Sequence, residues 1–127
     1  MNSKKTIQVS GMRPAAQGDV LFRRVSTVPP KYVRTPVRGA IIVAHSETGH
    51  HHSIDATDGV SLFRDPADSL VCYLSLEGIE YADVVHHRAW DTHATLRLLG
   101  GQAKEPTIFE VRRQREFTPD GWRRVED

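Results

Sequence analysis

The chain has 127 residues, a length that suits one compact domain. Its 17 Lys and Arg residues nearly balance its 16 Asp and Glu residues, which leaves a formal net charge of +1. This balance gives no strong signal for nucleic-acid binding and argues against an acidic disordered tail. No apolar run reaches the length of a signal peptide or a transmembrane segment, so we expect a cytoplasmic protein that does not associate with a membrane.

Residues 1–17 are mostly polar, and we expect them to form a flexible N-terminal arm ahead of a single β domain over residues 18–127. Short apolar runs separated by turn signals recur along that domain, and no helical period is sustained. The pattern predicts an all-β fold, either a small β-barrel or a sandwich of short antiparallel strands. The predicted strands cover residues 20–25, 40–44, 50–54, 60–63, 70–76, 80–86, 95–99, 107–114 and 122–125.

The single cysteine, Cys72, has no partner in the chain for a disulfide. It lies in the apolar run Val71-Cys72-Tyr73-Leu74, where a cysteine usually acts as a small buried hydrophobic residue. A reactive thiol is the alternative, and it would require a depressed pKa and access to solvent.

All seven histidines fall into two clusters, one at residues 45–52 and the other at residues 86–93. Imidazole is the commonest protein metal ligand and the usual proton carrier near neutral pH. The sequence therefore predicts a coordination shell or an acid–base site if the two clusters meet in the fold. The loops of a β domain often gather at one end, although the sequence alone does not bring these two together.

The first cluster is predicted to lie on a hairpin closed by residues 46–49. In the register that we expect, His45 lies opposite His50, and alternation places His52 on the same face as His50 while His51 points away. A slip of one residue would change the cross-strand partners, but His50 and His52 would remain on one face.

This arrangement favours a divalent metal ion, most readily zinc, with His45, His50, His52 and His93 as candidate ligands. Two other interpretations stay open: a solvated hairpin tip without a ligand, and metal-free acid–base or phosphate-binding chemistry.

Candidate catalytic residues accompany the histidines in both clusters. Glu47 at the hairpin tip could serve as a ligand or a base, and Asp91 could orient an imidazole of the second cluster, which also offers His93. Whether the protein is an enzyme is left open by these residues, because no established catalytic motif surrounds them.

The late strand is rich in arginine. Arg113 and Arg115 share one face of it and are candidate residues for binding a phosphate or a carboxylate. The alternative is a solvated edge strand, exposed to water, whose charges protect it from aggregation.

Four segments together resemble a family of short, uncharacterised bacterial, phage and plasmid proteins. The matching segments are Gln17-Gly18-Asp19-Val20, the hairpin segment from Ala44 to His52 that contains Thr48-Gly49-His50-His51-His52, the histidine loop from His86 to His93, and Gln114-Arg115-Glu116-Phe117. Compared with some members, this chain lacks one residue between Glu47 and Thr48 and has a longer second histidine loop. The resemblance covers residues 17–127 and implies that these motifs act as one unit, without implying a reaction.

Taken together, the sequence predicts a small β protein with a histidine-rich site that binds a divalent metal. The competing hypothesis is a non-enzymatic binding or assembly module of mobile-element origin. In that case the histidines and arginines would form a surface for a protein partner or for a second copy of the chain.

Overall fold

A computed structural model of the chain describes residues 6–11, 13–44, 51–55, 58–86, 94–101, 105–118 and 121–124, the last strand pair (115–118 and 121–124) by its backbone alone. The described residues form strands and connecting turns without any helix, which confirms the all-β prediction. Within these ranges there is accordingly no helix long and apolar enough to span a bilayer.

The strands follow one another at short intervals. They are β1 (Thr6–Val9), β2 (Ala15–Gln17), β3 (Val20–Val25), β4 (Val33–Thr35), β5 (Ile41–Ala44), β6 (His52–Ile54), β7 (Val60–Asp65), β8 (Asp68–Leu76), β9 (Tyr81–His86), β10 (Thr95–Leu99), β11 (Thr107–Arg113), β12 (Arg115–Thr118) and β13 (Gly121–Arg124).

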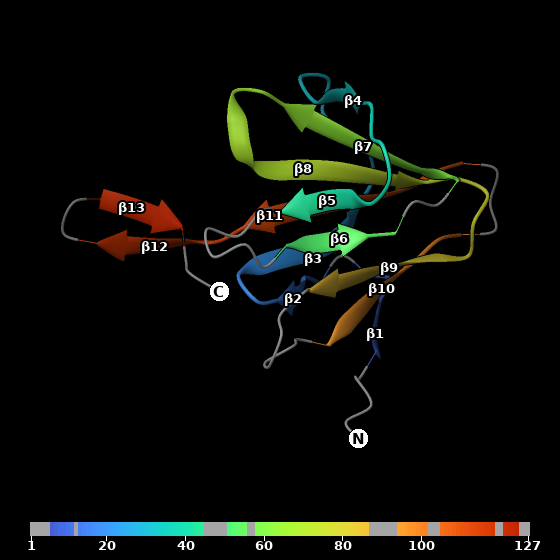
Figure 1. Ribbon diagram of the computed structural model, residues 1–127, viewed down its shortest axis with the longest axis horizontal. Helices are drawn as coiled ribbons and strands as arrows, with labels where there is room; N and C mark the ends of the chain where they lie inside the picture. Colours follow the sequence, from blue (N-terminus) through green and yellow to red (C-terminus); the bar gives the residue numbers. More distant parts are fainter. Residues whose placement is uncertain are drawn as a thin grey trace.

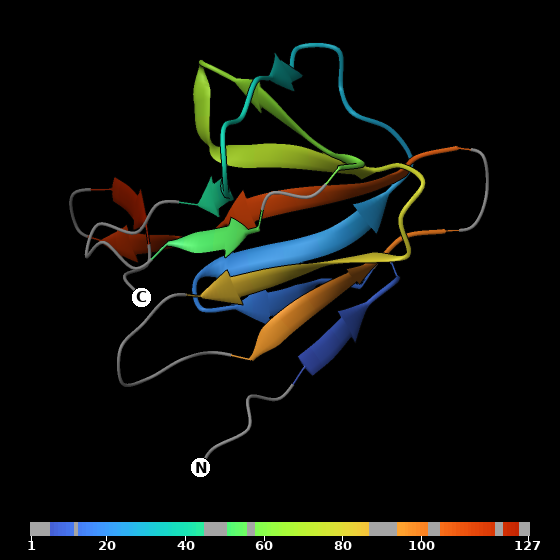
Figure 2. The ribbon, with the colours of Figure 1, turned by 45° about the vertical axis from the view of Figure 1, so that its right-hand side comes forward.

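Two larger sheets are formed, with a separate hairpin of β12 and β13. The first sheet has the order β1-β10-β9-β6-β5, and the second has the order β2-β3-β11-β8-β7-β4. All neighbours in these sheets are antiparallel except β1 and β10, which pair in parallel. The two sheets face each other, as the two views in Figures 1 and 2 show.

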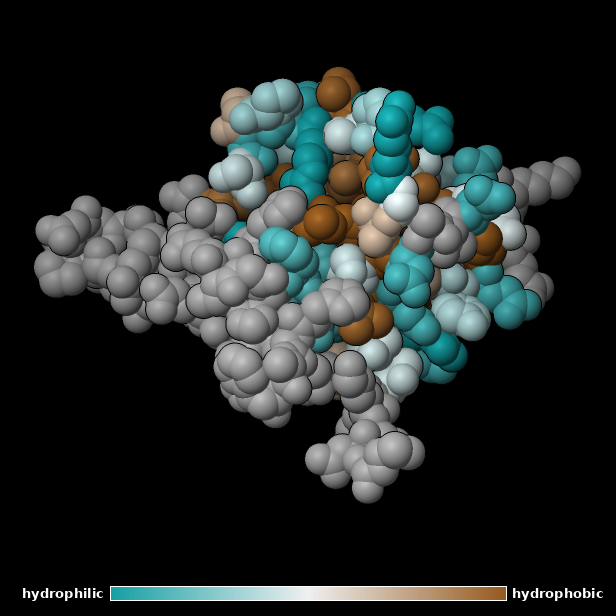
Figure 3. Space-filling model, in the orientation of Figure 1, coloured by the Kyte–Doolittle hydropathy of each residue, from teal (hydrophilic) through white to brown (hydrophobic). Residues whose placement is uncertain are grey.

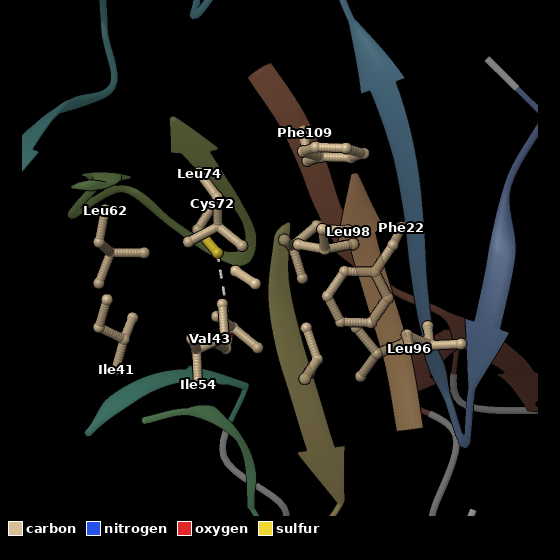
Figure 4. Close-up of a cluster of buried hydrophobic side chains, with 14 of the residues drawn as sticks. Phe22, Ile41, Val43, Ile54, Leu62, Cys72, Leu74, Leu96, Leu98 and Phe109 are labelled. Atoms are coloured by element: carbon tan, nitrogen blue, oxygen red, sulfur yellow. Dashed lines mark hydrogen bonds between the residues drawn. The ribbon is translucent and has the colours of Figure 1, made fainter. Parts of the chain in front are cut away.

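The core lies between the sheets and follows from alternation along each strand. Leu96 and Leu98 of β10 are fully buried, and so are Phe22 of β3 and Phe109 of β11 in the opposite sheet. Figure 4 shows these side chains converging from the two sheets. Because side chains of a strand point alternately to its two faces, strands such as β3, β9, β10 and β11 contribute every second residue to this core.

The eighth strand carries apolar residues on both of its faces. Cys72 and Leu74 belong to the main core, whereas Val71 and Tyr73 join a smaller cluster with Tyr32 on the other face of the second sheet. This double burial explains why residues 70–74 form an unbroken apolar run rather than an alternating one.

The late strand differs from the edge strand that the charges suggested. β11 lies between β3 and β8 and pairs with both, so it is an interior strand of its sheet. Arg113 is only 7% exposed, which corrects the expectation of a solvated face at this position. A buried arginine is tolerated there because a carboxylate faces it, as described below.

The N-terminal region also departs from the expected flexible arm. β1 and β2 fall within residues 1–17 and join different sheets, with Val9 and Gln17 buried. A four-residue strand with polar neighbours is a weak sequence signal, and its parallel pairing with β10 depends on residues far along the chain.

The Cys72 thiol is predicted to react slowly in the folded protein. Its side chain is 1% exposed, and burial raises its pKa to about 11, so little thiolate forms at neutral pH. Labelling with a thiol reagent at pH 7.5 should be negligible in buffer and complete in denaturant. Rapid labelling of the native protein would revive the interpretation of a reactive thiol.

Candidate functional site

A group of polar residues occupies one end of the core, where four strands place a polar side chain at the next inward position. In β9, Ala82 and Val84 point inward and His86 follows them, and in β11, Phe109 and Val111 are followed by Arg113. We call the whole group the buried polar cluster, and it consists of Gln17, Asp19, His52, His86 and Arg113.

The topology brings these positions to one end of the two sheets. β9 and β11 finish there, β6 begins there, and the turn between β2 and β3 lies at the same end, on the left in Figure 1. The cluster is therefore assembled from segments that are far apart in the chain, and Asp19 and Arg113, which bond each other, are 94 residues apart.

A tight turn places Asp19 in the cluster. Gln17 pairs with Val20, so Gly18 and Asp19 form a two-residue loop, and Gly18 has a φ of 59°. Glycine at the first loop position with positive φ is the pattern of a type II′ turn, which residues with a Cβ atom rarely adopt. The backbone carbonyl of Asp19 accepts a hydrogen bond of 2.9 Å from the amide of Gln114, which fixes the turn against the end of β11.

Gln17 determines which ring nitrogen of His52 carries a hydrogen in the neutral imidazole. Its side-chain Nε2 donates two hydrogen bonds of 2.8 Å, to the carbonyl oxygens of Val84 and Ala94. Both of these partners are acceptors, so the orientation of the amide is settled, and its Oε1 is the atom that lies 2.9 Å from Nδ1 of His52. His52 Nδ1 therefore carries a hydrogen, and in the neutral imidazole Nε2 keeps its lone pair.

Asp19 lies between His52 and Arg113. Its Oδ2 accepts a hydrogen bond of 3.1 Å from Nη2 of Arg113, while its Oδ1 is 3.8 Å from Nε2 of His52. The side chains of Asp19 and Arg113 are 0% and 7% exposed, so their opposite charges act in a medium that screens them weakly. The 3.8 Å between Oδ1 of Asp19 and Nε2 of His52 is too long for a hydrogen bond.

His86 joins the two histidine clusters. His52 and His86 are direct partners between β6 and β9, and their rings stack with centroids 4.0 Å apart and planes within 3°. His52 is the last histidine of the cluster at residues 45–52, and His86 is the first histidine of the cluster at residues 86–93. Their pairing shows that the two clusters adjoin, which the sequence left open.

The hairpin of the first cluster has a shifted register. Ile42 pairs with Ser53, but Ala44 pairs with His52 across a bulge, whereas the expected register would have placed Ala44 opposite His51. The bulge explains the correction, because an extra residue on one strand moves every later pair by one. His52 is buried as expected for an inward residue, and His51 is half-buried.

Most of the other predicted site residues lie outside the described residues. This holds for His45, Glu47, His50, Asp91 and His93, so their predicted roles stay predictions. Arg115 is described only by its backbone. Among the described side chains, no group of three or more His, Cys, Asp or Glu residues has the arrangement of a complete metal site.

Two residues of the cluster, Gln17 and Asp19, were missed as site residues by sequence reasoning. In the sequence they stood out only within Gln17-Gly18-Asp19-Val20, one of the four segments that resemble an uncharacterised family. The available signal was that a polar Gln-Gly-Asp segment precedes the buried strand β3 at a tight turn, which leaves its side chains next to the core. That signal alone does not predict that Gln17 and Asp19 lie next to the imidazole of His52.

A family model described as Domain of unknown function (DUF8820) matches residues 16–114. The chain belongs to this family. The matched segment of DUF8820 contains every member of the buried polar cluster, from Gln17 at its start to Arg113 at its end. No curated protein and no solved structure matches the chain.

Proposed function

We propose that this DUF8820 protein binds a divalent metal ion, zinc in the first instance, through His52 and Asp19. One observation carries the proposal: Gln17 accepts the hydrogen of Nδ1 of His52, which leaves the lone pair on Nε2, 3.8 Å from Oδ1 of Asp19. Histidines that ligate metals usually donate their second ring N–H to an oxygen in this way, which fixes the ring and its tautomer.

The distance between the two donor atoms supports the proposal. Ligand atoms that each lie about 2.0–2.2 Å from one zinc ion are at most about 4.4 Å apart. Nε2 of His52 and Oδ1 of Asp19 are separated by 3.8 Å, so both can contact one ion. Arg113 bonds the other carboxylate oxygen and would hold Asp19 in place as a ligand.

Further ligands are available close by in the chain. His50 precedes His52 by two residues, and His45 directly follows Ala44, the cross-strand partner of His52. We propose that one or two of His45, His50 and His93, the candidates that the sequence predicts, complete the shell. With three protein ligands and an open position the ion would act as a Lewis acid, whereas four protein ligands would make it a structural centre.

Zinc binding is expected to depend on His52 and to tolerate the loss of His51. His52→Ala should lower the association constant for zinc more than tenfold because it removes a ligand, whereas His51→Ala should change it less than about threefold. Isothermal titration of zinc into protein without an affinity tag measures both values at neutral pH.

His51→Ala is the matched control, because His51 directly precedes His52 in the chain. Equal losses in the two variants would indicate an adventitious histidine tract instead of a built site. If the natural protein takes up no zinc, the metal proposal is wrong. Asp19→Asn provides a second check, since it keeps the shape of the side chain but weakens the donor.

A further inference from the structure

A cavity of ≈ 430 Å³ lies between the two sheets, on the side where β5 and β4 are edge strands. Pockets for small molecules commonly have volumes of about 300–1,000 Å³ and mostly apolar walls. The walls here come from Val43 of β5, Cys72 of β8 and Val111 of β11, together with Leu70 and the half-buried Arg64 of β7. Figure 3 shows hydrophobic surface framed by hydrophilic side chains on the face where β5, β7 and β8 lie.

The charged side chains that line the cavity have different bonding partners. Arg113 bonds the Asp19 carboxylate. Asp65 accepts a hydrogen bond of 2.9 Å from the amide of Ala67, and Asp68 accepts bonds from the amide of Leu70 and the hydroxyl of Tyr32. These donors are neutral, so both aspartates keep their negative charges where they line the cavity, and Lys31 and Arg112 lie near enough to Asp68 to offset its charge in part.

The guanidinium of Arg64 also bonds only neutral groups among the described residues. Its Nη2 donates to the carbonyl oxygens of Ile42 and Val43, at 2.8 and 3.5 Å, and no carboxylate bonds it within the described part of the chain. These carbonyls are neutral acceptors on edge strand β5, and they leave the positive charge in place. The guanidinium has five N–H donors, so several of them remain for a ligand.

We propose that the cavity binds a small molecule with an apolar body and a carboxylate group, with Arg64 receiving the carboxylate. The apolar walls favour a hydrocarbon chain or ring, because burying it removes apolar surface from water. The cation selects the head group, since an arginine–carboxylate pair is a strong, charge-assisted interaction. This inference does not depend on the metal site.

Three probes of equal chain length test the proposal: octanoate, octan-1-ol and octylamine. With protein stripped of metal by a chelator, octanoate should bind at least about tenfold more tightly than octan-1-ol, and octylamine should bind most weakly. Bound octanoate should shift the methyl NMR signals of Val43 and Val111. The use of metal-free protein separates this test from the proposed function, because a carboxylate cannot then bind through zinc.

Variants test the role of Arg64 directly. Arg64→Met should bring octanoate down to the affinity of octan-1-ol while preserving the binding of the alcohol, and Asp65→Asn should leave the preference for octanoate intact. If Arg64→Met does not fold, the order of the three probes in the natural protein still decides. The proposal fails if none of the probes binds, if octylamine equals octanoate, or if the methyl signals stay unchanged.

Discussion

Replacing Arg113 with methionine should lower the free energy of unfolding by about 3–5 kcal/mol, the range found when one partner of a buried ion pair is removed. The Asp19 carboxylate is fully buried and lies 3.1 Å from the guanidinium of Arg113. Methionine retains much of the apolar stem, so the loss reflects the missing positive charge more than a cavity. Unfolding in urea, followed by tryptophan fluorescence, measures the change.

The adjacent arginine of β11 serves as the control. Arg112 also pairs with a carboxylate, that of Glu110, but its side chain is 52% exposed, so Arg112→Met should cost less than about 1 kcal/mol. In the double variant Asp19→Asn, Arg113→Met the effects should be smaller than their sum, because both changes break one interaction. Equal losses for the two arginine variants would contradict the buried pair.

Gln17→Leu should lower the free energy of unfolding by about 3 kcal/mol or more, because it takes a partner from three polar groups and each such loss costs about 1–3 kcal/mol. The affected groups are the carbonyls of Val84 and Ala94 and Nδ1 of His52. The same change removes the acceptor that keeps the hydrogen on Nδ1. Affinity for zinc should then fall about 10–100-fold, the usual effect of losing an orienting group.

Two measurements separate these effects. Nitrogen-15 NMR of His52 should show the hydrogen on Nδ1 in the natural protein and a different tautomer, or a mixture, in Gln17→Leu. Gln114→Leu is the matched control, because Gln114 is exposed, and it should change stability by no more than about 0.5 kcal/mol. A persistent Nδ1–H signal in the Gln17 variant would show that another group sets the tautomer.

Local patterns in the sequence predicted most of the strands. The expected strand at residues 20–25 coincides with β3, and that at 95–99 coincides with β10. Phe109, Val111 and Arg113, at alternate positions of the predicted strand 107–114, are all buried, because alternation is a property of the strand itself. The short strands β1 and β2 were missed, since three or four residues carry too little pattern to recognise.

The histidine site was predicted in part. That histidines cluster is visible in the chain, but the burial of His52 is known only from the structure, where it lies two residues before the buried Ile54. The bulge that pairs Ala44 with His52 has no signal in the sequence, because a bulge reflects how two whole strands fit together.

By itself, the sequence determined the all-β class, the core positions of the longer strands and the two histidine clusters, because these depend on residues close together in the chain. Only the tertiary structure decided that His52 stacks on His86, that Gln17 orients His52, and that Arg113 is buried against Asp19. These contacts join residues 34 to 94 positions apart, and they form only when two sheets bury their inward faces together. Strand order and register therefore create the site from residues that are unremarkable where they stand in the chain.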